Sequence, residues 1–289
     1  MCTFTPCTET ITPYIVLRTA YGDVTCEDRE VSEHRTGGGD PAHTLRLLWR
    51  QTDGPRRGPR QGRSLDEIVT VAIELADTEG LESVTMRALA QAVGVAPMTL
   101  YTYVPGKAEL LDLMLDLIYT NMERPDRSGE PWQTRVAAVA ADNRSLFTAH
   151  PWAAEVATGR PPLGPGQMTK YEYELRAFDG TGLDDVTRDA ALTYVLDFVR
   201  AAARSSAEAR SAQQESAWTD EQWWTANAPL LAQVLDERRF PTAVRVGAAA
   251  GAAQNAAYNP DQAYEFGLAR ILDGLTTLIT ATLDGTAPT

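Results

Sequence analysis

The spacing of apolar residues predicts helices along most of the chain. After Ser64, apolar side chains recur at intervals of three and four residues, the period of one helix face, at Ile68, Val71, Ala72, Leu75 and Ala76. The same period predicts later helices over 107–118, 130–150, 168–178, 184–208, 218–237 and 264–283. No stretch alternates apolar and polar residues for long enough to form a useful strand. The predicted fold class is all-α.

Residues 84–108 have the pattern of two short helices joined by a tight turn. Thr85 can cap the first helix, because its hydroxyl accepts from backbone N–H groups that have no helical partner. Gly94 suits the turn, where a positive φ is needed, and Pro97 suits the first turn of the second helix. Two short helices around a glycine turn predict a helix-turn-helix.

The remaining segments are predicted to be less regular. Residues 1–44 show no helical period and are interrupted by Gly37-Gly38-Gly39-Asp40-Pro41, so we expect a disordered extension, or a gene start placed too far upstream. Residues 45–50 could dock on the body or form a short helix. We expect a loop over 159–166, a mobile loop over 205–217 and irregular chain over 241–259. The expected organisation is an extension (1–44), a basic arm (45–63), a DNA-binding head (64–110) and a body (111–289).

The charge of the chain opposes DNA binding as a whole but favours it locally. The net charge is −13, whereas duplex DNA is a dense line of negative charge. Between residues 46 and 63, however, six arginines face one acid, Asp53. Glycine and proline interrupt this segment, so it is either a solvated linker or an extended arm that follows the DNA backbone or enters a minor groove. Beside a helix-turn-helix we favour the arm, with contacts from Arg56, Arg57, Arg60 and Arg63.

Other classes of protein find little support in the sequence. The three cysteines all lie within residues 2–26, which argues against a disulfide framework and makes a metal site improbable. Motifs of serine hydrolases, zinc proteases and phosphate-binding loops are absent from the sequence, so we expect neither an enzyme nor a cofactor. No apolar run approaches the length of a transmembrane helix, and we expect a cytoplasmic protein without a membrane partner.

The stretch from Ser64 to Leu111 resembles the N-terminal domain of TetR-family transcriptional regulators. The motifs that carry the resemblance are Ala72-x-x-Leu75-Ala76-x-x-x-Gly80, Thr85-Met86-Arg87-x-Leu89-Ala90-x-x-x-Gly94-Val95, Thr99-Leu100-Tyr101-x-Tyr103-Val104 and Lys107-x-x-Leu110-Leu111. The resemblance implies a homodimer that represses transcription from a palindromic DNA operator and is released by a small-molecule effector bound in the body.

The resemblance also assigns DNA contacts by position. Pro97, Met98 and Thr99 would reach base edges from the start of the recognition helix. Phosphate contacts would come from Thr85, Arg87 and Lys107, while the hydroxyls of Tyr101 and Tyr103 would reach a phosphate or a base. Met98 has the alternative of being partly a packing residue, and Tyr101 that of being mainly a core aromatic.

The body differs from the tetracycline repressor, in which a histidine before a Gly-x-x-Pro loop helps hold a drug-chelated magnesium ion. Ala157 takes that position here, so the sequence does not favour binding of a metal–tetracycline complex. We expect instead a small apolar or aromatic effector, with Phe147, Tyr171 and Tyr194 facing a cavity. His150 is expected at a helix end or in the core. Dimerisation is expected through helices over 184–208 and 262–283. The alternative is a DNA-binding protein without a small-molecule effector, controlled by a protein partner or architectural.

Overall fold

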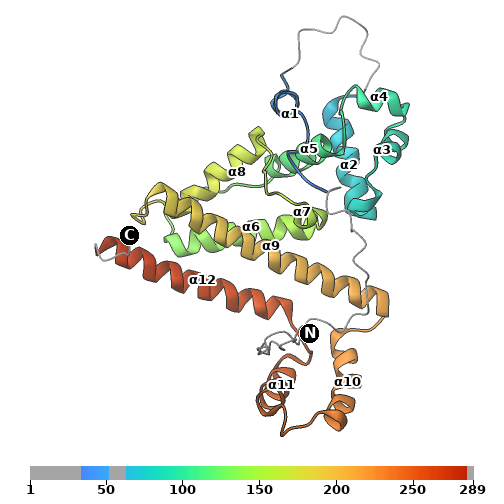
Figure 1. The fold of residues 1–289 in the computed structure, drawn as a ribbon. Helices are drawn as coiled ribbons and strands as arrows, with labels where there is room; N and C mark the ends of the chain where they lie inside the picture. Colours follow the sequence, from blue (N-terminus) through green and yellow to red (C-terminus); the bar gives the residue numbers. More distant parts are fainter. Residues whose placement is uncertain (1–33, 52–62, 285–289) are drawn as a thin grey trace, which may run out of the picture. The chain divides into compact units, whose positions relative to one another are not determined.

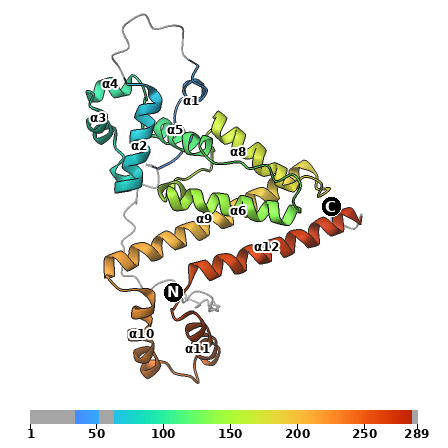
Figure 2. The same cartoon turned by 180° about the vertical axis from the view of Figure 1, so that it is seen from behind.

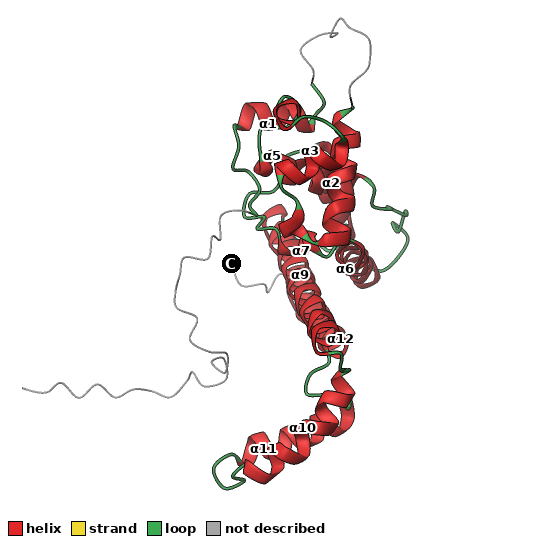
Figure 3. Cartoon of the chain, turned by 90° about the vertical axis from the view of Figure 1, so that its right-hand side faces the viewer, coloured by secondary structure: helices red, strands yellow, loops and turns green. Residues whose placement is uncertain are grey.

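The computed structural model describes residues 34–51 and 63–284, and within these ranges the regular structure is helical (Figure 3). The helices are α1 (Pro41–Leu48), α2 (Leu65–Glu79), η1 (Leu81–Ser83), α3 (Met86–Val93), α4 (Pro97–Tyr101), α5 (Lys107–Thr120), α6 (Trp132–Ala149), α7 (Trp152–Glu155), α8 (Pro165–Leu175), η2 (Arg176–Phe178), α9 (Asp185–Ser216), α10 (Asp220–Val234), α11 (Pro241–Gln254) and α12 (Pro260–Leu283). The described part contains no strand, only an isolated bridge between Arg35 and Ala157. The all-α prediction is confirmed.

The three helices α2, α3 and α4 form the predicted head. Ser64 and Glu67 make reciprocal capping bonds at the start of α2, and Thr85 accepts from the Ala88 N–H at 3.1 Å at the start of α3. Gly94 ends α3 with a φ of 77°, a conformation that favours glycine. Leu100 of α4 is fully buried, so one face of this short helix is fixed in the head and the other is left outside.

Helices α5 to α9 and α12 form the body (Figures 1 and 2). α5 packs against α8, α6 packs against α9, and α9 packs against α12. The two largest fully buried side chains are Trp152 in α7 and Phe178 in η2. Because α5 also packs on α2, this one helix belongs to both the head and the body.

Three regions of the body are more helical than predicted. α9 continues to Ser216 through the segment expected as a mobile loop, because its Ala, Glu, Gln and Arg residues have good helix propensity. α11 occupies most of the segment expected to be irregular, since alanine outweighs its two glycines. Gly251 has a packing role, because a Cβ there would lie 2.6 Å from the Trp224 ring. α12 begins at Pro260, where Asn259 supplies the cap.

The extension is also more ordered than predicted. Residues 34–44 are not disordered: they enter α1, whose N-cap Asp40 accepts from the His43 N–H at 2.7 Å. Both possibilities for residues 45–50 are realised, since α1 is a short helix and its Leu48 is buried in the core. Burial of Leu48 supplies the stabilisation that the local sequence lacks. The remaining residues of the predicted extension, 1–33, lie outside the described residues.

Among the described helices, α12 is long and apolar enough to cross a membrane by length and composition alone. In this fold its buried residues Tyr264, Ile271, Leu275 and Ile279 belong to the same core as α9. Only 17% of its most apolar window is buried, so the core accounts for part of the apolar character of α12.

Candidate nucleic-acid interface and body cavity

The predicted recognition helix α4 exposes one face to solvent. Met98 is 76% exposed and Tyr101 is 45% exposed, and Pro97 and Thr99 are exposed beside them. Leu100 lies on the opposite face in the core. Met98 is therefore not a packing residue in this chain, and Tyr101 is not mainly a core aromatic. An apolar side chain this exposed is available to contact another molecule.

Five of the other predicted contacts lie within the described residues, four of them in or beside the head helices and the fifth, Lys107, on α5. Thr85 and Arg87, at the start of α3, are exposed, and Arg63 is exposed just before α2. Tyr103 is half-buried and packs on the core. Arg56, Arg57 and Arg60 lie outside the described residues, so their role in the arm remains a prediction.

Lys107 begins α5 and is half-buried. Its Nζ lies 3.0 Å from Nε2 of His34. Sequence reasoning missed this contact, because a separation of 73 residues leaves no local signal.

Asp77, near the end of α2, joins the head to the body. Its carboxylate accepts from the indole N–H of Trp152 at 2.7 Å and lies 2.9 Å from Nδ1 of His150. His150 is the C-cap residue of α6, so its expected position at a helix end is confirmed.

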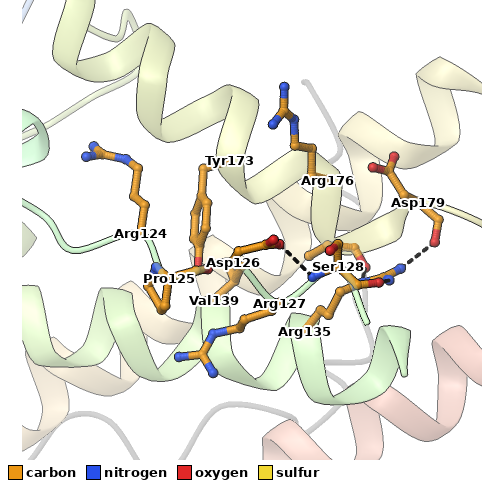
Figure 4. Close-up of a pocket in the computed structure, with 11 residues that line it drawn as sticks. Arg124, Pro125, Asp126, Arg127, Ser128, Arg135, Val139, Tyr173, Arg176 and Asp179 are labelled. Atoms are coloured by element: carbon orange, nitrogen blue, oxygen red, sulfur yellow. Dashed lines mark hydrogen bonds between the residues drawn. The ribbon is translucent and has the colours of Figure 1, made fainter. Parts of the chain in front are cut away.

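A cavity of about 530 Å³ lies where the loop after α5 meets α6, α8 and η2 (Figure 4). Apolar and aromatic surface comes from Pro125, Val139 and Tyr173, and polar groups come from Arg124, Asp126, Arg127, Ser128, Arg135, Arg176 and Asp179. The Arg135 side chain donates to the carbonyls of Ala177 and Asp179, which ties α6 to the chain after α8. The Tyr173 ring stands between Arg124 and Arg176 in the close-up (Figure 4).

A buried polar network lies deeper in the body. Lys170 of α8 donates to Glu174 at 2.8 Å, and the Asn143 amide of α6 donates to the same carboxylate at 2.5 Å. Burial lowers the pKa of Lys170, and the Glu174 charge opposes this shift. The Lys170 ammonium also lies 5.3 Å from the centre of the Tyr119 ring, and burial raises the pKa of that phenol to about 12. For the Lys170–Glu174 pair, the only signal in the sequence is their spacing of four residues on one helix.

The structure does not bring the three predicted ligand-facing aromatics into one cavity. Phe147 is buried in the core, and Tyr171 donates to Asp189 at 2.7 Å across the α8–α9 contact. Tyr194 is 61% exposed on α9. Helical period predicted that these rings lie on helices of the body, but it could not predict which inter-helix space each one enters.

Comparison with known proteins agrees with this geometry. The family profile described as "Bacterial regulatory proteins, tetR family" matches residues 68–114, and the profile described as "Tetracyclin repressor-like, C-terminal domain" matches residues 124–279, more than half of the chain. The chain belongs to the TetR family of transcriptional regulators. The profile matches and the fold thus confirm the resemblance to TetR-family regulators that the sequence motifs predicted.

Individual relatives are similar over most of their length. The chain is 37% identical over 262 residues to the HTH-type transcriptional repressor DrrR1 of Streptomyces coeruleorubidus, covering 90% of this chain and 94% of that protein. It is 26% identical over 213 residues to the class C tetracycline repressor protein of Escherichia coli, covering 73% and 89% of the two chains. The crystal structure of the TetR family protein ActR of Streptomyces coelicolor in complex with actinorhodin is 28% identical, with a TM-score of 0.62 over 75% of this chain and 96% of that one.

These comparisons support a ligand-responsive transcriptional repressor, because the relatives include named repressors and a neighbour solved with a bound small molecule. The match of the N-terminal profile covers most of α2, all of α3 and α4, and the first half of α5. The exposed face of α4 therefore belongs to the part of the chain that TetR-family regulators share.

Proposed function

We propose that this chain is a homodimeric repressor that binds a palindromic operator in the cytoplasm and leaves it when a small effector enters the body. The observation that carries the proposal is the exposed start of α4 on a head whose other helices are firmly capped. A recognition helix must present its N-terminal side chains to base edges without losing its own packing. Pro97, Met98 and Thr99 meet that requirement, since Leu100 alone anchors this helix deep in the core.

The proposed DNA contacts of the head fall into two groups, those to bases and those to phosphates. The exposed ring methylenes of Pro97 and the thioether of Met98 suit apolar contact with thymine methyl groups. Contacts to phosphates would come from Thr85, Arg87 and Lys107. These contacts would fix the orientation of the head on the DNA. Arg63 and the arginines of the arm would add positive charge that the acidic body lacks.

The dimer would form through the outer faces of α9 and α12. α9 and α12 bury one face against each other, while Val186 and Tyr194 on α9 and Phe266 and Leu283 on α12 stay exposed in the single chain. Two such pairs can close a four-helix bundle with a second copy. This arrangement would place two recognition helices one helical turn of DNA apart, about 34–36 Å.

The effector would bind in the cavity beside Tyr173. Its Pro125, Val139 and Tyr173 surfaces suit an apolar or aromatic molecule, and its arginines can orient polar substituents. The cavity favours this reading over a regulator without an effector. An effector shifts the protein off DNA only through its different affinity for the two states.

A selection experiment tests the proposal. The full chain is used to select duplexes from a random-sequence library, and the enriched duplex is compared with unrelated DNA in a gel-shift competition. We expect an inverted repeat and a preference of about 1000-fold or more over unrelated DNA. Met98→Ala should change the preferred bases, whereas Met168→Ala on α8 should not. Binding without sequence preference would support an architectural protein instead.

The effector site has a separate test. The wild-type chain and Tyr173→Ala are screened by thermal shift against aromatic and apolar metabolites. A compound that stabilises wild type but not the variant, and that releases the selected duplex, would support the cavity. Equal stabilisation of both chains by every releasing compound would place the effector elsewhere.

A further inference from the structure

Residues 34–51 cross the junction between the head and the body, and we call this segment the strap. At its start, the Ala157 N–H donates to the His34 carbonyl at 3.0 Å, and the Thr36 N–H donates to the Ala157 carbonyl at 3.3 Å. The Thr36 hydroxyl donates to the Arg160 carbonyl at 2.5 Å, and Thr36 is buried. The strap is thus hydrogen-bonded to the loop of the body that follows α7.

The far end of the strap is fastened to the same loop and also to the head. The indole N–H of Trp49 donates to the Leu163 carbonyl at 2.8 Å. One residue later, the Arg50 guanidinium donates to Asp66 of α2 at 2.6 Å. Adjacent residues of one short segment therefore hold a body loop and a head helix.

Between these ends the strap lies directly on α5. The Gly37 N–H donates to the Asp112 carboxylate at 3.3 Å, and α1 packs on α5 through the buried Leu48. A Cβ at Gly39 would lie 2.0 Å from the Glu109 carboxylate. The glycine run, predicted only to interrupt structure, allows the close approach of the strap to α5.

The strap also touches a predicted DNA contact. The Lys107 Nζ lies 3.0 Å from His34 Nε2, and His34 itself bonds the body through its carbonyl. Turning the ammonium toward a phosphate would weaken its contact with His34. DNA binding by the head would then weaken the first hydrogen bond between the strap and the body, which the His34 carbonyl accepts.

We propose that the strap is a second mechanical link, alongside α5, between the DNA-binding head and the 157–163 loop. The proposal rests on the proposed function, because it assumes that the head binds DNA. Energetic coupling between two sites requires an element that both sites bias, and it acts equally in both directions. DNA binding should therefore change the loop, and a change in the loop should alter DNA binding.

Hydrogen exchange tests the strap without knowledge of the effector. The full chain is measured with and without the selected duplex, and exchange is followed in peptides that cover 157–163. In the wild type, DNA should change the exchange rate of this loop by about fivefold or more, the lower range of allosteric coupling. Thr36→Val and Trp49→Phe should each reduce this response to less than about twofold while the chain still binds the duplex.

Two control variants match these substitutions. Thr70→Val removes an exposed hydroxyl that bonds only within α2, and Trp218→Phe alters an indole that is 46% exposed, as Trp49 is. Both should respond to DNA as the wild type does. Trp49→Phe is the milder strap variant, and it keeps the test decisive if Thr36→Val does not fold.

The outcomes separate the strap from the proposed function. If the wild type binds DNA and its loop does not respond, or if both strap variants respond fully, the strap is not a link. If the wild type selects and binds no duplex, the proposed function itself fails and the strap proposal falls with it.

Discussion

The Asp77 carboxylate lies 2.7 Å from the indole nitrogen of Trp152, and this hydrogen bond joins the end of α2 to the start of α7. The same carboxylate meets His150. Together with the strap and α5, it makes the head–body junction a set of specific polar contacts rather than a flexible linker.

Asp77→Ala should destabilise the chain by about 1–3 kcal/mol, because the buried Trp152 side chain would lose its acceptor. Chemical denaturation measures the free energy of unfolding. Glu74→Ala, at an exposed position on the same helix, should change it by less than about 0.5 kcal/mol. Equal effects of the two substitutions would show that the junction bond adds nothing.

Lys107→Ala should weaken binding to all DNA sequences and lower the salt dependence of binding. Each phosphate contact that is lost should reduce the slope of log K against log salt by about 0.9. Fluorescence anisotropy at several salt concentrations measures this slope, with Arg245→Ala on the exposed surface of α11 as the control for charge. An unchanged slope would rule out the proposed docking of the head.

Phe266→Asp should disrupt the proposed dimer. Phe266 is 69% exposed in the single chain, and burying it in a dimer would contribute about 1.5–3 kcal/mol from each copy. The dimer dissociation constant should therefore rise by about 100-fold or more, as measured by sedimentation equilibrium. Met168→Asp, on α8, should leave it unchanged. A Phe266→Asp chain that remains as dimeric as wild type would place the interface elsewhere.

Asp112→Asn should change how stability depends on pH. Burial raises the pKa of this carboxyl from 3.8 to about 6, helped by the neighbouring Glu109 and Asp116 and opposed by the Gly37 N–H. A raised pKa in the folded state means that this group's stabilisation is present below about pH 4 and is lost as pH rises through about 6. The amide stays neutral and can still accept from Gly37.

The midpoint of thermal unfolding of Asp112→Asn should therefore rise relative to wild type between about pH 4 and pH 7. Gln91→Ala, which changes no titratable group at an exposed position on α3, should differ from wild type by a constant amount. A constant difference between Asp112→Asn and wild type across this range would mean that the carboxyl titrates as it does in the unfolded chain.

Lys170→Met should destabilise the body by about 3–5 kcal/mol, because it leaves the Glu174 charge buried without its partner. The double variant Lys170→Met/Glu174→Gln should recover much of this loss, since no lone charge remains. Denaturation of the two single variants and the double variant gives the coupling energy. Additive losses would show that the two charges act independently.

Local sequence was sufficient for the head. Ser64, Thr85, Gly94 and Pro97 determine caps and turns through their own side chains and backbone preferences, and the helices begin and end where they predict. The apolar periods of α5, α6 and α12 likewise predicted helices of the body. The Ala-rich and Gln-rich stretches of α9 and α11 were harder, because composition without a clear apolar period does not distinguish helix from loop.

By itself, then, the sequence determined the all-α class and the helix-turn-helix, since these follow from local caps and short-range periods. The family came from the resemblance of its motifs to those of known regulators. Only the tertiary structure decided the course of residues 34–51, the contact of Lys107 with His34 and the burial of the Lys170–Glu174 pair. It also decided that Phe147, Tyr171 and Tyr194 do not share a cavity. These features depend on which helix faces meet across long sequence separations, and periodicity predicts a face but not its partner.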